Sequence, residues 1–288
     1  MVLRLVLCCI YLCITVSLAQ TESQVFLVEV DFTEKGFEFH NLQNISKNQG
    51  YNNQPFFAND STLLYARNNE AQTDIAVYNI NEKTTTFFNE KTEGGEYSPK
   101  PFPKTQEIAA VRLDPDGKQR LYRYSEAGSS PIFSDLQIAY FTFFDENSML
   151  ATVLDGNEMD LIFATITSQK ADTLLQNAGR SLHTVPIAKA LSYNAMNDFG
   201  QYDVYQLDPV SKESFFVCEL PIGVQDYAWW DDDKIFIGSG ATLFVYDLFG
   251  EGDWQQVTSF SEYNMTNITR LAFSPDKKHL AFVAEQKN

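Results

Sequence analysis

The sequence is poor in cysteine, which argues against a fold held together by disulfide bonds. Four cysteines occur in 288 residues, and three of them, Cys8, Cys9 and Cys13, lie in the first twenty. Cys218 is left without a partner for an internal disulfide. A chain of this length does not need one, because it can bury most of its apolar surface in a core. Cys218 lies in the strand-like run 213–220, where we expect a buried structural thiol rather than a nucleophile.

Basic residues are also scarce. The chain has 21 Lys and Arg against 38 Asp and Glu, a formal net charge of −17. Nucleic acids and anionic membrane surfaces attract basic patches, so this balance argues against both as partners. The acidic residues are scattered through turn-like stretches, and we interpret them as a solvated surface that suits a soluble protein or a cationic partner.

Long apolar runs are missing except near the N-terminus. Arg4 precedes the apolar run 5–16, and Ser17-Leu18-Ala19 has the small-x-small pattern of a cleavage site. This order predicts a signal peptide over residues 1–19, because the run is too short for a typical spanning helix. A retained N-terminal anchor is the alternative. We expect an exported protein, periplasmic or extracellular, without a membrane span in the mature chain, and a single domain over residues 20–288.

Helical periodicity is absent from the remaining sequence, and a repeated phrase is present instead. A bulky residue opens each phrase, at steps of 41 to 45 residues: Phe57, Phe102, Phe144, Val185, Trp230 and Phe273. Each phrase predicts four short strands, as in residues 55–65 for the first two, 74–80 for the third and 84–88 for the fourth. The third strand recurs at 120–124, 160–165, 203–207 and 242–247. The fifth phrase is shorter between its first and third strands, which predicts a clipped hairpin rather than a lost blade.

The last phrase supplies only two strands, and the N-terminal region supplies the other two. Residues 25–32 have the third-strand pattern and residues 36–42 the fourth. Pairing them with the last phrase would close the chain on itself and cover its open edge. The repeat therefore predicts an all-β fold: a six-bladed β-propeller of four-stranded antiparallel blades, the last blade closed by the N-terminal strands.

The phrases resemble those of the TolB-type, WD-repeat-like propellers of exported bacterial proteins. The segment 271–282, with its aromatic-Ser-Pro-Asp sequence before an apolar strand, is the best match, and 57–60 with 73–78 is a degraded one. Two departures from the family pattern leave a lone propeller as the expectation. The sequence offers no room for the α/β domain that precedes the propeller in TolB, and no Gly-x-Ser-x-Gly elbow of a hydrolase domain is present.

Propellers bind ligands around the starts of their innermost strands, at the mouth of the central channel. Ionisable and aromatic side chains gather at these predicted positions. The candidate ligand-binding residues are Glu96, Tyr97, Tyr140, Arg180, His183, Asp226, Tyr227 and Arg270. Arg180 and Arg270 could hold an anion, and the tyrosines could stack on a sugar or a peptide. Simple scaffold pairing of these charges is the competing interpretation.

The sequence leaves the function open between two classes. We expect a monomeric binding or interaction module whose partner is an envelope protein, a peptide or a sugar. The alternative is a small-molecule hydrolase, lactonase or lyase that uses Glu96, His183 and Asp226 as base or acid. No cofactor is expected, although calcium held by Glu96 and Asp226 would fit the second class. Zinc is disfavoured, because no two histidines have metal-ligand spacing.

Overall fold

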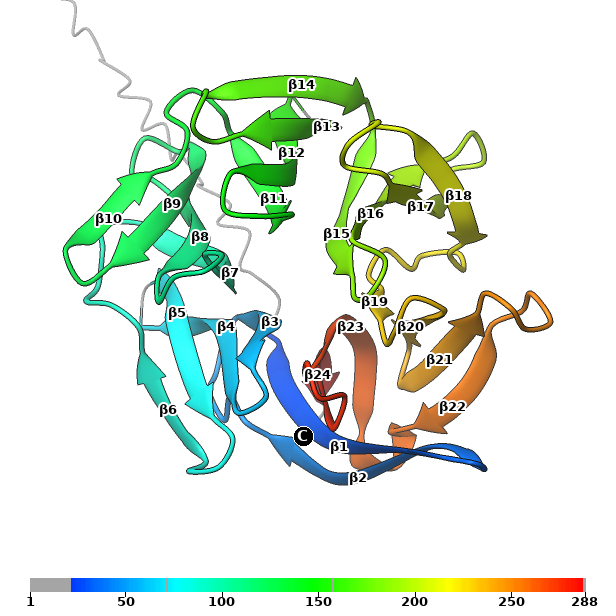
Figure 1. Cartoon of the computed structure of the whole chain (residues 1–288). Coiled ribbons are helices and arrows are strands. Elements are labelled where there is room, and N and C mark those ends of the chain that lie inside the picture. Colours follow the sequence, from blue (N-terminus) through cyan, green and yellow to red (C-terminus); the bar gives the residue numbers. More distant parts are fainter. Residues whose placement is uncertain (1–21, 71, 157, 287–288) are drawn as a thin grey trace, which may run out of the picture.

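The structure, a computed structural model, describes residues 22–70, 72–156 and 158–286. Within these ranges a 3-10 turn at Ser261–Tyr263 is the one helical element, and no helix is long and apolar enough to cross a membrane. Six four-stranded antiparallel sheets form a ring (Figure 1). The predicted six-bladed propeller is therefore confirmed, while the predicted signal peptide at 1–19 lies outside the described residues.

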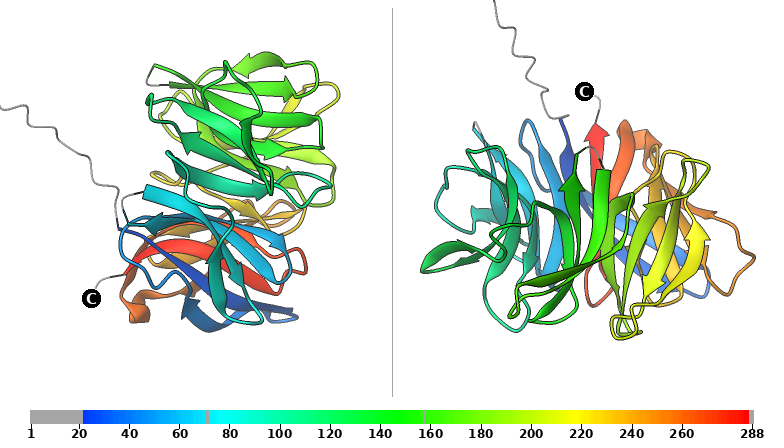
Figure 2. Two further views of the ribbon diagram at one scale, coloured as in Figure 1. Left: turned by 90° about the vertical axis from the view of Figure 1, so that its left-hand side faces the viewer. Right: turned by 90° about the horizontal axis from the view of Figure 1, so that it is seen from above.

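The closing blade joins the two ends of the chain. Its strand order is β2 (Gly36–Asn44), β1 (Gln24–Thr33), β24 (His279–Gln286) and β23 (Met265–Phe273), with β23 innermost. In the register of β1 and β24, Gln24 pairs with Ala284 and Glu29 with His279. The N-terminal strands thus supply the third and fourth positions, as predicted. Both ends of the described chain lie on one face of the ring (Figure 2).

Five further blades follow in chain order and are numbered 1 to 5. The strands of each blade are given from the innermost to the outermost. Blade 1 comprises β3 (Asn52–Asn59), β4 (Thr62–Asn69), β5 (Gln72–Asn79) and β6 (Thr84–Phe87). Blade 2 comprises β7 (Gly95–Pro101), β8 (Ile108–Leu113), β9 (Gln119–Ser125) and β10 (Gly128–Pro131). Blade 3 comprises β11 (Ile138–Phe143), β12 (Ser148–Asp155), β13 (Glu158–Thr165) and β14 (Lys170–Leu175). Blade 4 comprises β15 (Ala178–Val185), β16 (Ala190–Met196), β17 (Tyr202–Leu207) and β18 (Ser214–Glu219). Blade 5 comprises β19 (Ala228–Trp229), β20 (Lys234–Ser239), β21 (Thr242–Asp247) and β22 (Gln255–Ser259).

The core lies between blades rather than within them. Successive side chains of a strand point to opposite faces of its sheet, so a strand buried on both faces packs against two neighbours. In β1, Phe26 and Val28 pack with blade 5, whereas Val25 and Leu27 pack with blade 1. The described residues form six such apolar clusters, one at each junction between adjacent blades. Cys218 belongs to the cluster between blades 4 and 5, and its thiol is buried, as expected.

The innermost strands are irregular where they begin, and this irregularity positions the site. Bulges interrupt the pairing of β3, β7, β11, β15 and β23 with their neighbours. At three of them a residue takes a left-handed backbone conformation: Gln54 (φ 57°), Ser98 (φ 51°) and Arg270 (φ 52°). Such conformations are uncommon outside glycine and cluster at ligand sites. They occur here on three consecutive inner strands.

Blade 5 has the shortest innermost strand of the ring. Strand β19 spans only Ala228 and Trp229, and the segment that precedes it is irregular. The second strand, β20, consequently comes close to β23: a Cβ added at Gly238 would lie 2.4 Å from a side-chain carbon of Ile268. The clipped hairpin predicted for this phrase is present, and blade 5 keeps four strands.

Candidate functional site

Two cavities lie along the centre of the ring, one on each side of a layer of charged side chains. The first, of ≈ 470 Å³, is lined by residues near the starts of the innermost strands, including Tyr51, Asn53, Ile222 and Asn267, and we call it the mouth. The second, of ≈ 220 Å³, continues toward the strand ends past Phe57, Pro186 and Phe273, and we call it the inner cavity. Both are lined by Tyr140, Arg180, Asp226 and Arg270, so these four residues form a waist between them.

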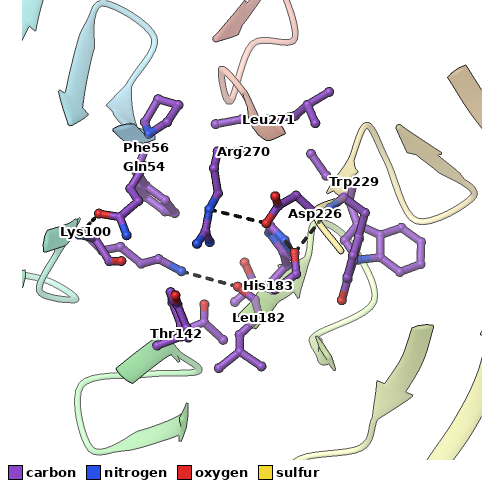
Figure 3. A pocket seen from close by; sticks show the side chains of 18 of the residues that line it. Gln54, Phe56, Lys100, Thr142, Leu182, His183, Asp226, Trp229, Arg270 and Leu271 are labelled. Carbon is purple, nitrogen blue, oxygen red and sulfur yellow. Dashed lines mark hydrogen bonds and ion pairs between the residues drawn. The ribbon is translucent and has the colours of Figure 1, made fainter. Parts of the chain in front are cut away.

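The waist is an ion cluster built from three different segments of the ring. Arg180 of β15 donates to Asp226 through Nε at 3.0 Å and Nη2 at 2.5 Å, a two-point contact that fixes both groups. Arg270 of β23 approaches the same carboxylate with Nε at 3.4 Å. The guanidinium of Arg270 also lies 5.0 Å from the Tyr140 ring centroid. In Figure 3 the terminal nitrogens of Arg270 point away from Asp226 and into the cavity.

Asp226 is held in its charged form by these arginines. Burial by itself would raise the pKa of the carboxyl, but the charges of Arg270 and Arg180 outweigh this and lower the pKa. A carboxylate with two guanidinium partners leaves the waist with a net positive charge. This local charge is opposite in sign to that of the chain as a whole.

A buried lysine adds a third basic group. Lys100 of β7 extends across the inner cavity, and its Nζ donates to the backbone oxygen of Leu182 at 3.4 Å (Figure 3). Its Nζ lies 5.2 Å from the ring centroid of Phe56 and 5.5 Å from that of Phe141. Burial, together with the charge of Arg270, lowers the pKa of the Lys100 ammonium to about 7. The amine is therefore divided between its charged and neutral forms near neutral pH.

His183 of β15 lines the same cavity but is held neutral. Its Nε2 lies 2.9 Å from the Ser181 hydroxyl, and its ring packs 4.7 Å from that of Tyr227. Burial and the neighbouring Lys100 lower the pKa of the imidazole to about 3. With so low a pKa, the His183 imidazole is too weak a base to take a proton from the Ser181 hydroxyl near pH 7. The pair therefore serves as neutral hydrogen-bonding surface.

Side chains from the second strand of blade 4 hold the site residues in place. The Asn194 carboxamide accepts from the Ser181 N–H at 3.1 Å and donates to the Gln225 oxygen at 2.9 Å, so it ties the bulge that carries Arg180 to the segment that carries Asp226. A Cβ added at Gly179 would lie 2.3 Å from Asn194 Oδ1, which explains a glycine there. Ser192 accepts from the Tyr227 hydroxyl at 2.9 Å and from the Trp229 indole at 2.8 Å.

The structure brings six of the eight sequence-predicted residues together around the inner cavity: Tyr140, Arg180, His183, Asp226, Tyr227 and Arg270. Glu96 and Tyr97 line neither cavity. The Tyr97 ring lies 5.9 Å from that of Tyr51, beside the mouth. Sequence reasoning missed Lys100 and Asn194. Lys100 had a signal: it precedes the bulky residue Phe102 by two positions, as the predicted His183 precedes Val185.

Glu96 lies instead at the junction of blades 1 and 2, where it is fully buried. Its Oε1 accepts from the Thr92 hydroxyl and from the Tyr124 hydroxyl at 3.2 Å. Burial raises the pKa of the carboxyl to about 7, and the nearby carboxyl of Asp74 adds to this rise. Glu96 and Asp226, which the sequence suggested as calcium ligands, line no common cavity. Among the described residues no group of three or more His, Cys, Asp or Glu side chains is placed to hold a metal ion.

Comparison with known proteins shows similarity in structure alone. No family model matches the chain, and no curated protein matches it. The putative TolB from Agrobacterium tumefaciens superposes with a TM-score of 0.67 at 12% identity, over 93% of this chain and 99% of that one. The fold is that of TolB-type β-propellers.

Two further solved structures extend this TolB-like comparison. TolB from Acinetobacter baumannii gives a TM-score of 0.58 at 8% identity, over 92% of this chain and 64% of its own. The oligogalacturonate lyase from Vibrio parahaemolyticus gives 0.54 at 9% identity, over 92% of this chain and 98% of its own. At such identities the likeness shows the propeller fold and leaves the site to be argued from its own residues.

Proposed function

We propose that this TolB-like propeller is a binding module that takes a small carboxylate-bearing ligand in its central channel. One observation carries the proposal: Arg180, Arg270 and Lys100, from three different blades, converge on one cavity, where Asp226 is the only acidic side chain among the described residues. A guanidinium donates strong, charge-assisted hydrogen bonds to carboxylates. The negative charge of the chain makes this convergence of cations distinctive.

The two arginines have different roles in the proposed binding site. Asp226 occupies two nitrogens of Arg180, which makes Arg180 a support for the carboxylate of Asp226. Arg270 contacts Asp226 through Nε, and its terminal nitrogens are directed into the cavity (Figure 3). We therefore expect Arg270 to contact the ligand directly, while the rings of Phe56 and Phe141 cover its apolar part.

The enzyme alternative finds less support in this geometry. Glu96 is separated from the cavity that His183 and Asp226 line, and Asp226 is engaged by two arginines. The similarity to an oligogalacturonate lyase is a likeness of fold at 9% identity. It does motivate a sugar acid as one ligand to be tested. Export to the periplasm or the extracellular space also belongs to the proposal, on the strength of the sequence of residues 1–19.

The test compares matched ligands and matched variants by calorimetry. Galacturonate and succinate should bind to the unmodified protein, whereas galactose and succinamide should not. Arg270→Gln should weaken binding about tenfold or more, because a charge-assisted hydrogen bond contributes about 1.5–3 kcal/mol. Lys104→Gln, an equal change of charge on an exposed side chain, should leave the affinity unchanged. Equal binding of the neutral ligands, or equal losses in both variants, would overturn the proposal.

A further inference from the structure

The Lys100 amine is placed to react with a ligand as well as to attract it. Its Nζ lies inside a cavity, and no ion pair to a carboxylate involves it among the described residues. Its Nζ donates to the backbone oxygen of Leu182, and two phenyl rings flank it. A lysine on an aromatic-lined wall beside other cations has the environment in which lysine amines act as nucleophiles.

We propose that Lys100 forms a reversible imine with ligands that carry a ketone or aldehyde next to a carboxylate, that is, 2-oxo acids. The inference rests on the proposed function, since Arg270 would hold the carboxylate while Lys100 meets the adjacent carbonyl carbon. Both side chains point into the same inner cavity, from β23 and β7 respectively (Figure 3).

The reaction balances without an oxidant or a reductant. The lone pair of the neutral amine attacks the carbonyl carbon, a C–N bond forms, and the electron pair of the C=O bond moves to the oxygen. The two amine protons are transferred to that oxygen, which leaves as water, and the C=N bond replaces the C=O bond. Water returning to the carbon reverses the sequence and releases the ligand.

The surroundings of Lys100 favour the neutral amine that the first step requires. Burial disfavours the ammonium, and the charge of Arg270 acts on it through space. With a pKa of about 7, neutral Lys100 amine is well populated at pH 7. An ordinary lysine has only about one neutral amine in several thousand at this pH. Lys100 should therefore react ahead of every exposed lysine.

The experiment traps the imine by reduction. The whole protein is incubated with pyruvate and sodium cyanoborohydride at pH 7, and the modified lysines are located by peptide mass mapping. We expect Lys100 to be modified about tenfold or more faster than the exposed Lys104, which acts as an internal control. Lys100→Arg retains the charge and should remove the main adduct. Acetone, which has the carbonyl but lacks the carboxylate, should modify Lys100 far more slowly.

Calorimetry with lactate, which keeps the carboxylate and lacks the carbonyl, separates this inference from the proposed function. Binding of lactate without a Lys100 adduct from pyruvate would overturn the imine and leave the proposed function standing. An adduct at Lys100 that forms equally fast with acetone would overturn the role of the carboxylate, and with it the 2-oxo acid. The absence of both lactate binding and an adduct would overturn both proposals.

Discussion

Asp226 and Glu96 are two buried carboxyl groups near the starts of inner strands, and their surroundings give them opposite chemistry. Asp226 faces two arginines at the waist, which lower its pKa and keep it charged. Glu96 faces hydroxyl groups and the Asp74 carboxyl, and burial raises its pKa to about 7. The difference teaches that burial alone does not set the charge of a carboxyl: burial raises the pKa of both groups, and only at Asp226 do nearby guanidinium groups outweigh it.

The two groups also affect stability in opposite pH ranges. Asp226 contributes stability that is present above its unfolded pKa near 3.8 and is lost as the pH falls below it. Glu96 contributes stability that is present below its unfolded pKa near 4.5 and is lost as the pH rises toward 7. The first group thus favours neutral conditions and the second acidic conditions.

Removal of Asp226 is expected to have the largest effect. Asp226→Ala leaves Arg180 and Arg270 buried without a counter-charge, and breaking such a cluster costs about 3–5 kcal/mol in free energy of unfolding. Urea unfolding at pH 7 measures the loss, and added acetate should restore part of it by occupying the vacated position. Asp198→Ala, which removes an exposed carboxylate, is the control. Equal stability of the two variants would show that the arginines do not depend on Asp226.

Replacement of Glu96 should have an effect of opposite sign. Glu96→Gln keeps the shape and stays neutral, so it avoids the cost of a buried charge above pH 7. We expect the variant to be more stable than the parent by about 1–3 kcal/mol at pH 8. The difference should shrink toward zero at pH 4.5, where the parent is also neutral. Thermal unfolding across this range tests the expectation, and a constant difference would contradict the raised pKa.

The third prediction concerns the residue that positions Asp226. Asn194→Ala removes two hydrogen bonds, one buried and one partly buried, and should cost about 2 kcal/mol in free energy of unfolding. It should also weaken carboxylate binding, because Arg180 and Asp226 lose their common support. Thr152→Val is the matched control on the second strand of blade 3, since the Thr152 hydroxyl is buried without a partner. A similar loss in both variants would argue against a positioning role for Asn194.

The fold was predictable because each blade repeats the same physical requirement. A blade buries both faces of its inner strands, so the bulky residue at each phrase start and the alternating third strand recur at a near-constant step. Even the closure by residues 25–32 followed from this pattern. The apolar clusters between adjacent blades meet this requirement: Phe26 packs against blade 5, whereas Val25 packs against blade 1.

The site was only partly predictable, because the bulges decide which side chain faces the centre. Arg180, Asp226 and Arg270 were placed together from their positions before the bulky residues, and they do meet. Glu96 holds a comparable position in the sequence, but its side chain is buried between blades 1 and 2. It lies two residues before Ser98, whose backbone is left-handed. Nothing in the local sequence specifies that turn. Asn194 lies on a second strand, where only the tertiary contact with Gly179 and Gln225 reveals its role.

The pairing of β1 with β24 has a consequence for how the molecule is made. Val25 and Val283 are neighbours in one sheet although nearly the whole chain separates them. Strand β1 is synthesised long before β24. The edge of β1 that pairs with β24 therefore stays unpaired until the five intervening blades have been made. Contacts of such long sequence separation slow folding, and open strand edges invite association with other chains. The pairing of β1 with β24 closes the ring, and the period before it is therefore when a chaperone would protect the chain most.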